Sequence, residues 1–253
     1  MSTPNAEYRK TPAASGAALS PWWLRAMLVA LGLAAWFWTQ SLIGQRAFPE
    51  KTVGDGLHAL TAPAHQYLID HPRVADGLLI ISSAFIDLFA IFLLGRAIFG
   101  PTLRPFVGLL MLFALRQICQ ALCALPPPEA MIWRNPGFSS LVVTYGVAND
   151  LFFSGHTAIA VLGAIELARL GRRWLGVLGA GIALFEVVTV LTLRAHYTMD
   201  VFTGAVTALM VAGIAAKISP WCDRVLAGLT GRKPGSTGDS PVAPGDPPNA
   251  PRN

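Results

Sequence analysis

Charged residues are scarce in this chain of 253 residues: Asp, Glu, Lys and Arg make up 13% of it, about half of the roughly 25% typical of soluble globular domains. Hydrophobic residues account for 53%, and the mean hydropathy is +0.52. They come in long runs rather than at amphipathic spacing, which excludes an ordinary soluble core and indicates a membrane-embedded chain. The net charge of +5 is small and Lys and Arg form no long run, which argues against a nucleic acid partner.

Cysteine is equally rare, with three residues in the whole chain. Cys119 and Cys123 stand one helical turn apart within an apolar run, and Cys222 follows far downstream. No histidine cluster lies near them, so we interpret them as packing residues rather than zinc ligands. Nothing else in the sequence suggests metal ligands, and we expect neither a metal nor another cofactor.

Six apolar runs are each close to the roughly 20 residues that cross a bilayer core. They cover approximately residues 22–43, 76–99, 103–125, 149–170, 174–194 and 199–217. We therefore predict an all-α, polytopic membrane protein built as a bundle of six transmembrane helices.

The two ends of the chain have a different composition. Residues 1–20 are polar and rich in small residues, and residues 219–253 are rich in Pro and Gly. Neither segment can bury enough apolar surface to fold, so we predict that both are disordered and that 21–218 form the membrane domain.

The basic residues predict the orientation of the six spans. Of the 19 Lys and Arg residues, thirteen fall on the side of the two termini, five fall on the other side, and Arg116 lies within the third span. The positive-inside rule then places both termini in the cytoplasm. The loops 44–75 and 126–148 would face outward, to a periplasm or an organelle lumen.

Two polar stretches stand out against the apolar background. Residues 150–157 (DLFFSGHT) open the fourth span, and residues 194–201 (RAHYTMDV) join the fifth span to the sixth. Between His156 and His196 the chain crosses the membrane twice. Both histidines are therefore expected on the same side of the membrane, whichever way the protein is inserted.

These residue types are suited to chemistry at phosphorus. His196 and Asp200 have i, i+4 spacing, so one helical face can carry both, and the carboxylate can fix the imidazole tautomer and leave the other nitrogen free to attack. His156 follows Ser154 and Gly155 at the start of a helix, where backbone N–H groups favour a phosphate oxyanion. A second histidine opposite the nucleophile can protonate the leaving oxygen. The pattern predicts in-line displacement through a phosphohistidine.

At these positions the chain resembles the type 2 phosphatidic acid phosphatase (PAP2) superfamily, and within it the sphingomyelin synthase branch. The branch has an Asp followed by Ser-Gly-His-Thr, as in residues 150–157, and His-Tyr-Thr-x-Asp-Val, as in residues 196–201. It also has an arginine in the third span followed by Leu-Pro-x-Pro, matching Arg116 and residues 125–128. The resemblance covers about residues 78–217 and implies a six-helix bundle of PAP2 type.

The resemblance also implies roles for individual residues. His196 would be the nucleophile, Asp200 the acid that orients it and His156 the general acid, in a metal-independent reaction on the outer face. The residues expected to contact substrate are Ser154, Gly155, Tyr197, Arg116, Asp150 and Glu129.

Some elements of the lipid phosphatases in this superfamily are missing. Their Lys-x6-Arg-Pro element is matched only by Arg104-Pro105, which we place on the opposite side of the membrane, and Val190 stands where they have an arginine. Losing two phosphate-clamping elements argues against hydrolysis of a dianionic phosphomonoester. Ala148-Asn149 replace the Cys-Gly of animal sphingomyelin synthases, which weakens a prediction of choline specificity.

Four charged residues fall inside the predicted spans. An unpaired charge at the bilayer centre costs at least about 2.5 kcal/mol, so Arg116 is expected either to pair with Asp87 or Glu186 or to contact the substrate phosphate. Glu166, nearer the cytoplasmic end, is expected to be solvated or to pair with a nearby arginine.

The leading hypothesis is a lipid headgroup phosphotransferase. A phospholipid would donate a phosphocholine or phosphoethanolamine type headgroup, and a lipid alcohol such as ceramide would accept it. The alternative is a lipid phosphate phosphatase, in which water replaces the alcohol, and a third reading is a non-enzymatic scaffold or small transporter. The sequence leaves the oligomeric state open.

Overall fold

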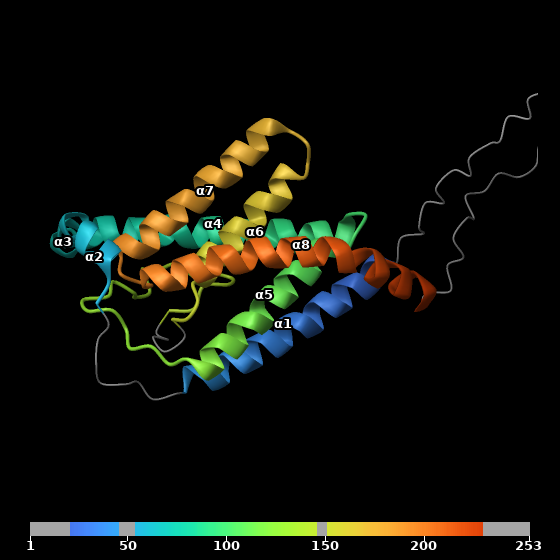
Figure 1. The fold of residues 1–253 in the computed structure, drawn as a ribbon, viewed down its shortest axis with the longest axis horizontal. Helices are drawn as coiled ribbons and strands as arrows, with labels where there is room; N and C mark the ends of the chain where they lie inside the picture. Colours follow the sequence, from blue (N-terminus) through green and yellow to red (C-terminus); the bar gives the residue numbers. More distant parts are fainter. Residues whose placement is uncertain (1–20, 46–53, 146–150, 230–253) are drawn as a thin grey trace, which may run out of the picture.

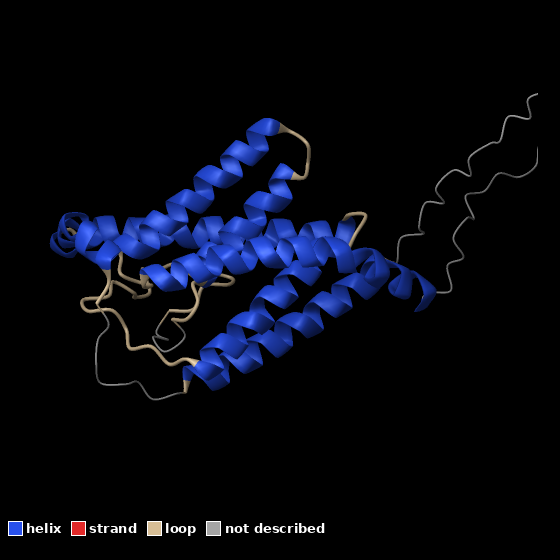
Figure 2. Ribbon diagram, in the orientation of Figure 1, coloured by secondary structure: helices blue, strands red, loops and turns tan. Residues whose placement is uncertain are grey.

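The computed structural model describes residues 21–45, 54–145 and 151–229, and helices make up most of these ranges (Figures 1 and 2). In chain order they are α1 (Trp22–Gly44), α2 (Gly56–Leu60), α3 (Ala62–Asp70), α4 (Pro72–Phe99), α5 (Arg104–Leu122), α6 (Gly155–Ala168), α7 (Arg173–Thr192) and α8 (Thr198–Leu229). The described residues contain no strand (Figure 2). The predicted all-α class is therefore confirmed.

Among the described helices, α1, α4, α5, α7 and α8 are long and apolar enough to cross a membrane. The helix expected from the fourth apolar run, α6, has 14 residues, which is about 21 Å at 1.5 Å per residue against a hydrocarbon core of about 30 Å. The predicted span 149–170 is thus too long. Residues 151–154 form no helix and lead to the cap at Ser154, and the chain turns at Gly171, whose φ is +79°. Because α6 packs against α4, α5, α7 and α8, protein surrounds this short helix.

Two further boundaries differ from the prediction. The third span was expected to reach residue 125, but α5 ends at Leu122 and Cys123 is already extended. Pro126, the first of three prolines, has no N–H to bond the Leu122 carbonyl four residues before it, which disfavours a longer helix. The disordered tail was expected to begin at 219, but α8 continues to Leu229. In this extension Asp223 accepts hydrogen bonds from the Thr102 hydroxyl at 2.7 Å and from a backbone N–H at 2.8 Å, so it is anchored to the α4–α5 turn. Residues 230–253 and 1–20 lie outside the described ranges.

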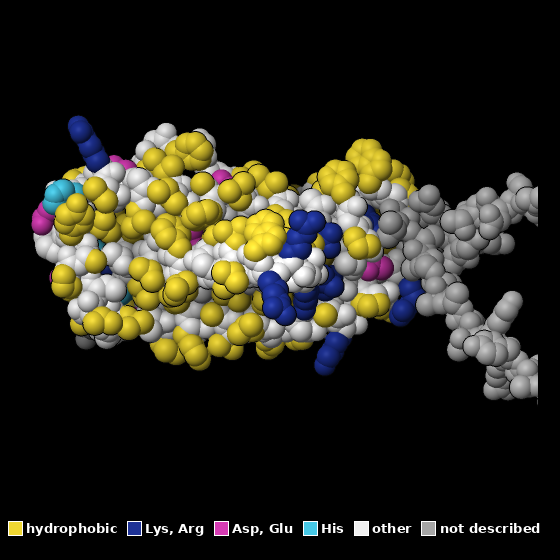
Figure 3. Space-filling view, turned by 90° about the horizontal axis from the view of Figure 1, so that it is seen from above, with side chains coloured by type: hydrophobic (Ala, Val, Ile, Leu, Met, Phe, Trp, Pro, Cys, Tyr) yellow, Lys and Arg dark blue, Asp and Glu magenta, His cyan; other side chains and the backbone are white. Residues whose placement is uncertain are grey.

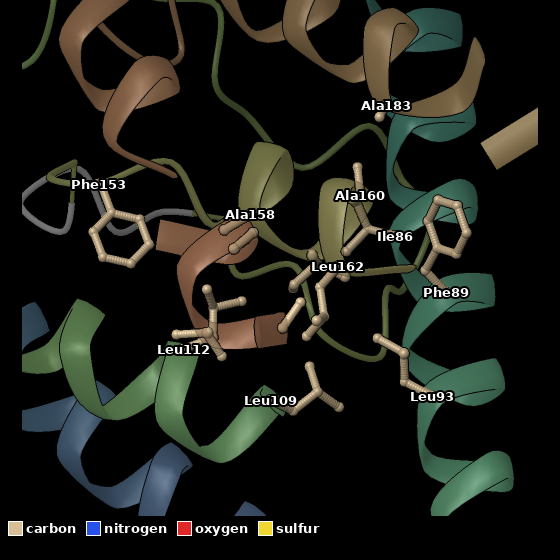
Figure 4. Close-up of a cluster of buried hydrophobic side chains, with 14 of the residues drawn as sticks. Ile86, Phe89, Leu93, Leu109, Leu112, Phe153, Ala158, Ala160, Leu162 and Ala183 are labelled. Atoms are coloured by element: carbon tan, nitrogen blue, oxygen red, sulfur yellow. The ribbon is translucent and has the colours of Figure 1, made fainter. Parts of the chain in front are cut away.

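The bundle core forms around α6 (Figure 4). Ile86, Phe89 and Leu93 of α4 face it from one side, and Leu109 and Leu112 of α5 from another (Figure 4). Gly163 of α6 allows this approach, since a Cβ there would lie 2.4 Å from the ring of Phe89. The core therefore fixes α6, and the residues at its N-terminus, in the middle of the molecule.

The helices alternate in direction along the long axis of the molecule (Figure 1). The start of α1, the α4–α5 and α6–α7 turns and the end of α8 lie toward one end, whereas α2, α3 and the α7–α8 turn lie toward the other (Figure 1). In the view of Figure 3 hydrophobic side chains cover the middle, and most visible Lys and Arg side chains gather toward the first of these ends. This distribution fits an integral, multi-pass membrane protein.

Candidate active site

A backbone hydrogen bond joins the N-terminus of α6 to the first turn of α8. The Ser154 N–H donates to the backbone carbonyl of Asp200 at 3.0 Å, and the Ser154 side chain caps α6 by accepting from the Thr157 N–H at 3.3 Å. Gly204 of α8 makes the close approach possible, because a Cβ there would lie 2.7 Å from the Ser154 carbonyl oxygen. The start of α6 and the first turn of α8 therefore form one unit.

This unit brings the two predicted histidines together. The ring centroids of His156 and His196 are 6.5 Å apart, and both side chains are buried. Both line a small pocket of about 50 Å³, and the ring of Trp133 meets that of His156 edge-on at 5.3 Å. The Nε2 atom of His156 is buried and has no hydrogen-bond partner among the described residues. Two imidazoles thus line one pocket.

The contact between His196 and Asp200 differs from the one expected. His196 Nδ1 lies 3.0 Å from the Leu151 carbonyl oxygen and 3.7 Å from Asp200 Oδ2, so the backbone carbonyl is its hydrogen-bond acceptor. The same Oδ2 instead accepts from the Tyr197 N–H at 2.9 Å, as an acid in the first turn of a helix does in a capping box. The carbonyl still fixes the tautomer, because a ring nitrogen facing an acceptor must carry the proton. His196 Nε2 is left with the lone pair.

Arg116 supplies positive charge beside the two histidines. It lines the same pocket, and its Nε donates to the Phe153 carbonyl at 2.9 Å and its Nη1 to Gln40 at 3.3 Å. A Cβ on Gly155 would lie 3.3 Å from Arg116 Nε, so glycine lets the guanidinium approach the start of α6. A guanidinium and a helix N-terminus on one pocket wall form a site for an anion such as phosphate.

Three further residues predicted to contact substrate, Glu129, Tyr197 and Ser154, are not among those that line the pocket. Glu129 is exposed and is not among the residues that line the pocket, although its backbone carbonyl accepts from Arg194 at 3.1 Å. Tyr197 is buried, with its hydroxyl donating to the Pro126 carbonyl at 3.1 Å, and Ser154 is fully buried as the α6 cap. Asp150 falls outside the described residues.

The alternative partners proposed for Arg116 are engaged by other groups. Asp87 accepts from the Ser140 hydroxyl at 2.8 Å and from two backbone N–H groups of the same loop. Glu186 accepts from the Ser82 hydroxyl at 2.6 Å. Contact between Arg116 and the substrate phosphate stays a prediction, consistent with the place of Arg116 on the pocket wall.

Charged groups at the opposite end of the bundle form a separate network. Glu166 is buried and accepts a two-pronged contact from Arg104, at 3.1 and 2.9 Å, and an ion pair from Arg169 at 2.5 Å. The predicted pairing of Glu166 with a nearby arginine is confirmed. Arg104 is thus held at the C-terminal half of α6, away from the histidines at its start.

The sequence did not reveal that the segment before α4 holds the α7–α8 turn. Asp55 accepts from the Thr198 N–H and hydroxyl, both at 2.5 Å, at the first turn of α8, and from the N–H groups of Leu57 and His58, at 2.9 and 3.2 Å, at the start of α2. The ring of His58 lies 2.9 Å from the His196 backbone oxygen. We call Asp55, His58 and His65 the turn clamp.

His65 completes the turn clamp from α3. Its Nδ1 donates to the Thr192 carbonyl at 2.8 Å, at the end of α7, and its Nε2 is buried with no partner among the described residues. An isolated acid and two histidines spread along a polar loop carry no recognisable motif. Only the capping position of Asp55 directly before a helix could have signalled part of this role.

Two members of the turn clamp have shifted pKa values. Burial raises the pKa of the Asp55 carboxyl, but hydrogen bonds from Thr198 and His58 outweigh it, so the pKa lies below its usual 3.8. Burial lowers the pKa of His65 below 6.5, against the opposing effect of its bond to Thr192. Near neutral pH Asp55 is therefore a carboxylate and His65 a neutral imidazole, the forms that make these bonds.

Fold and site together define a class: an all-helical, multi-pass membrane protein in which two histidines and an arginine converge on a buried pocket. The comparison of sequences goes one step further. The profile of the AtPDCT1/2 family matches residues 55–217, and the chain belongs to that family. The matched range begins at Asp55 and contains both histidines and Arg116.

Two curated relatives from Arabidopsis thaliana match more distantly. Phosphatidylcholine:diacylglycerol cholinephosphotransferase 1 is 22% identical over 158 residues, which is 62% of this chain and 51% of the relative. Phosphatidylcholine:diacylglycerol cholinephosphotransferase 2 is 25% identical over 126 residues, which is 49% of this chain and 40% of the relative. The chain thus spans about half or less of the length of these relatives.

Proposed function

We propose that this protein is a lipid headgroup phosphotransferase that moves a phosphorylated headgroup from a phospholipid to a lipid alcohol. The observation that carries the proposal is the convergence of His156, His196 and Arg116 on one buried pocket. Arg116 and the N-terminus of α6 attract the phosphate, and the two imidazoles offer a nucleophile and an acid. The printed names of the relatives, both cholinephosphotransferases, support the same reaction class.

In the first step His196 Nε2 attacks phosphorus and forms a P–N bond. The P–O bond to the glycerol of the donor breaks, and His156 gives its proton to the leaving alkoxide, so that diacylglycerol departs. In the second step the hydroxyl of the acceptor attacks the phosphohistidine, and His156 takes the proton of that hydroxyl. The headgroup is thereby transferred without net consumption of water or protons, and Arg116 balances phosphate charge throughout.

The substrates follow from the relatives rather than from the pocket. We propose phosphatidylcholine as the first donor to test and diacylglycerol as the first acceptor, because both appear in the names of the two relatives. Ceramide, the acceptor expected from the resemblance to sphingomyelin synthases, and phosphatidylethanolamine are the second pair.

The same proposal includes a topology. The short α6 would complete a six-helix bundle of the PAP2, sphingomyelin synthase-like type. The Lys and Arg side chains gathered at the end opposite the histidines (Figure 3) would place the active site on the outer or lumenal face and both termini in the cytoplasm.

The decisive experiment uses the full chain in nanodiscs with phosphatidylcholine that carries a labelled phosphocholine group. Adding diacylglycerol of distinct chain length should give labelled phosphatidylcholine of the new mass, and omitting the acceptor should leave label on the protein. His196→Gln should abolish both. His71→Gln, a control at an exposed histidine, should retain both. Inorganic phosphate released from phosphatidic acid, with no headgroup transfer, would identify a phosphatase and overturn the proposal.

A further inference from the structure

A second pocket lies directly behind the candidate active site, between α1, α4 and α5. Its volume is about 210 Å³, and its walls are almost entirely apolar, formed among others by Gly32, Leu33, Leu94, Phe106 and Phe113. Well-packed protein contains few voids larger than a water molecule, and an apolar cavity of about 150 Å³ already binds benzene. A space of this size and character therefore fits a hydrocarbon ligand.

The two pockets share a wall. Trp36 and Phe113 line both of them, and their rings stack with centroids 4.6 Å apart. From Phe106 to Gln117 the second pocket follows α5 over about 17 Å at 1.5 Å per residue, close to half of the roughly 30 Å hydrocarbon core. The pocket thus has about the length of one acyl chain in one leaflet, and it borders the polar pocket at Trp36 and Phe113.

Polar atoms without partners lie on the second pocket, one of them on Trp36 of the shared wall and the other on Gln117. Among the described residues the buried Trp36 Nε1 has no acceptor and the buried Gln117 Oε1 has no donor, whereas Gln117 Nε2 donates to Gln40 at 3.1 Å. Buried polar groups usually have partners. A glycerolipid whose phosphate lay beside His196 would bring ester carbonyls to this depth, and a lipid alcohol would also bring a hydroxyl.

We propose that this second pocket binds one acyl chain of the lipid substrate, with the ester end of that chain at Trp36 and Gln117 and the headgroup phosphate at the histidines. This acyl-chain site rests on the proposed function, since it is the phosphate position that sets the depth of the chain. It makes the substrate a lipid held by its tail as well as its headgroup. The enzyme would then select lipids by the length of this acyl chain, because a longer chain fills more of the pocket along α5.

Neighbouring alanines on α1 offer a matched pair of variants. Ala35 and Ala34 are both exposed, but Ala35 lines the second pocket and Ala34 is not among its lining residues. Ala35→Phe should lower kcat/KM at least about tenfold for long-chain donors and less for short-chain donors, since a methylene in an apolar pocket is worth tenfold or more. Ala34→Phe adds the same bulk to the same helix and should leave the chain-length profile unchanged. Trp36→Phe should lower kcat/KM for all chain lengths.

A second measurement separates this proposal from the proposed function. Phosphatidylcholine with a photoreactive group midway along one chain should label residues 32–39 and 106–117, and unlabelled phosphatidylcholine should compete. Labelling that does not saturate, or that survives unchanged in Ala35→Phe, would show bulk lipid and overturn the acyl-chain site. Saturable labelling in a protein that transfers no headgroup would retain the acyl-chain site while the proposed function fails. Headgroup transfer with identical chain-length profiles for Ala35→Phe and Ala34→Phe would retain the proposed function while the acyl-chain site fails.

Discussion

Removing the Asp55 carboxylate should disable the candidate site without touching any residue that lines it. The carboxylate accepts hydrogen bonds from two groups of Thr198 and from the Leu57 and His58 N–H groups, so it joins the starts of α2 and α8. A bond to a charged group contributes about 1.5–3 kcal/mol, and partial exposure reduces that figure. We therefore expect Asp55→Ala to destabilise the turn clamp by about 2–3 kcal/mol in total.

Loss of the Asp55 carboxylate should also lower activity, because the turn that it holds carries His196. His196 lies two residues before Thr198, and a displacement of about 1 Å in a catalytic group can cost about 100-fold in rate. Asp55→Ala should thus lower kcat about 10- to 100-fold, while KM for the donor changes less, because the printed hydrogen bonds of Asp55 go to Thr198, Leu57 and His58 and not to Arg116. Asp55→Asn keeps one acceptor oxygen but loses the Thr198 N–H bond, so its kcat should be intermediate.

The assay is headgroup transfer in nanodiscs at saturating donor, normalised to folded protein. Asp70→Ala is the control, because Asp70 is exposed at the end of α3, close in sequence to the turn clamp, and bonds only Gln66 among the described contacts. The reasoning fails if Asp55→Ala keeps wild-type kcat. It fails equally if activity falls only in proportion to the folded fraction.

Three further changes test other parts of the structure. Gly155→Ala should lower kcat/KM about tenfold with a stability change under about 1 kcal/mol, since a Cβ would lie 3.3 Å from the Nε of Arg116; equal activity in a transfer assay would contradict this. Acidification should weaken the turn clamp. The pKa of His65 is lowered in the folded state, so the stabilisation by neutral His65 is complete above pH 6.5 and is lost as the pH falls below that value. The melting temperature should therefore fall between pH 6.5 and 5 in the wild type and depend less on pH in His65→Gln. Glu166→Ala leaves two arginines without their buried partner and should cost about 3 kcal/mol in a denaturation experiment, yet kcat per folded molecule should be unchanged.

The sequence predicted two membrane crossings between His156 and His196, and any pair separated in this way returns to one side. That both histidines lie at the same end of the helix pair α6–α7 could therefore be predicted, whereas the 6.5 Å between their rings could not. The acceptor for His196 could not be predicted in this way. The Leu151 carbonyl reaches it from a non-helical lead-in to α6, and backbone carbonyls have no signature in a sequence.

The turn clamp and the end of α8 show a second limit. Contacts such as that from Asp55 to Thr198 join segments 143 residues apart, and their polar residue types are common in any loop. Residues 219–229 were grouped with the Pro-rich residues beyond them, although they continue α8, and Leu226 and Ala227 are buried. Composition averaged over a whole tail hides a short helical extension at its start.

The position of α6 has a consequence for the membranes in which this protein can work. Changes in bilayer thickness act on lipid-facing helices, which respond by tilting, whereas α6 is enclosed by four neighbours. The Ser154–Asp200 backbone bond ties its first turn to that of α8. The spacing of the two imidazoles is consequently set by protein alone, and turnover should tolerate hosts whose membranes differ in thickness.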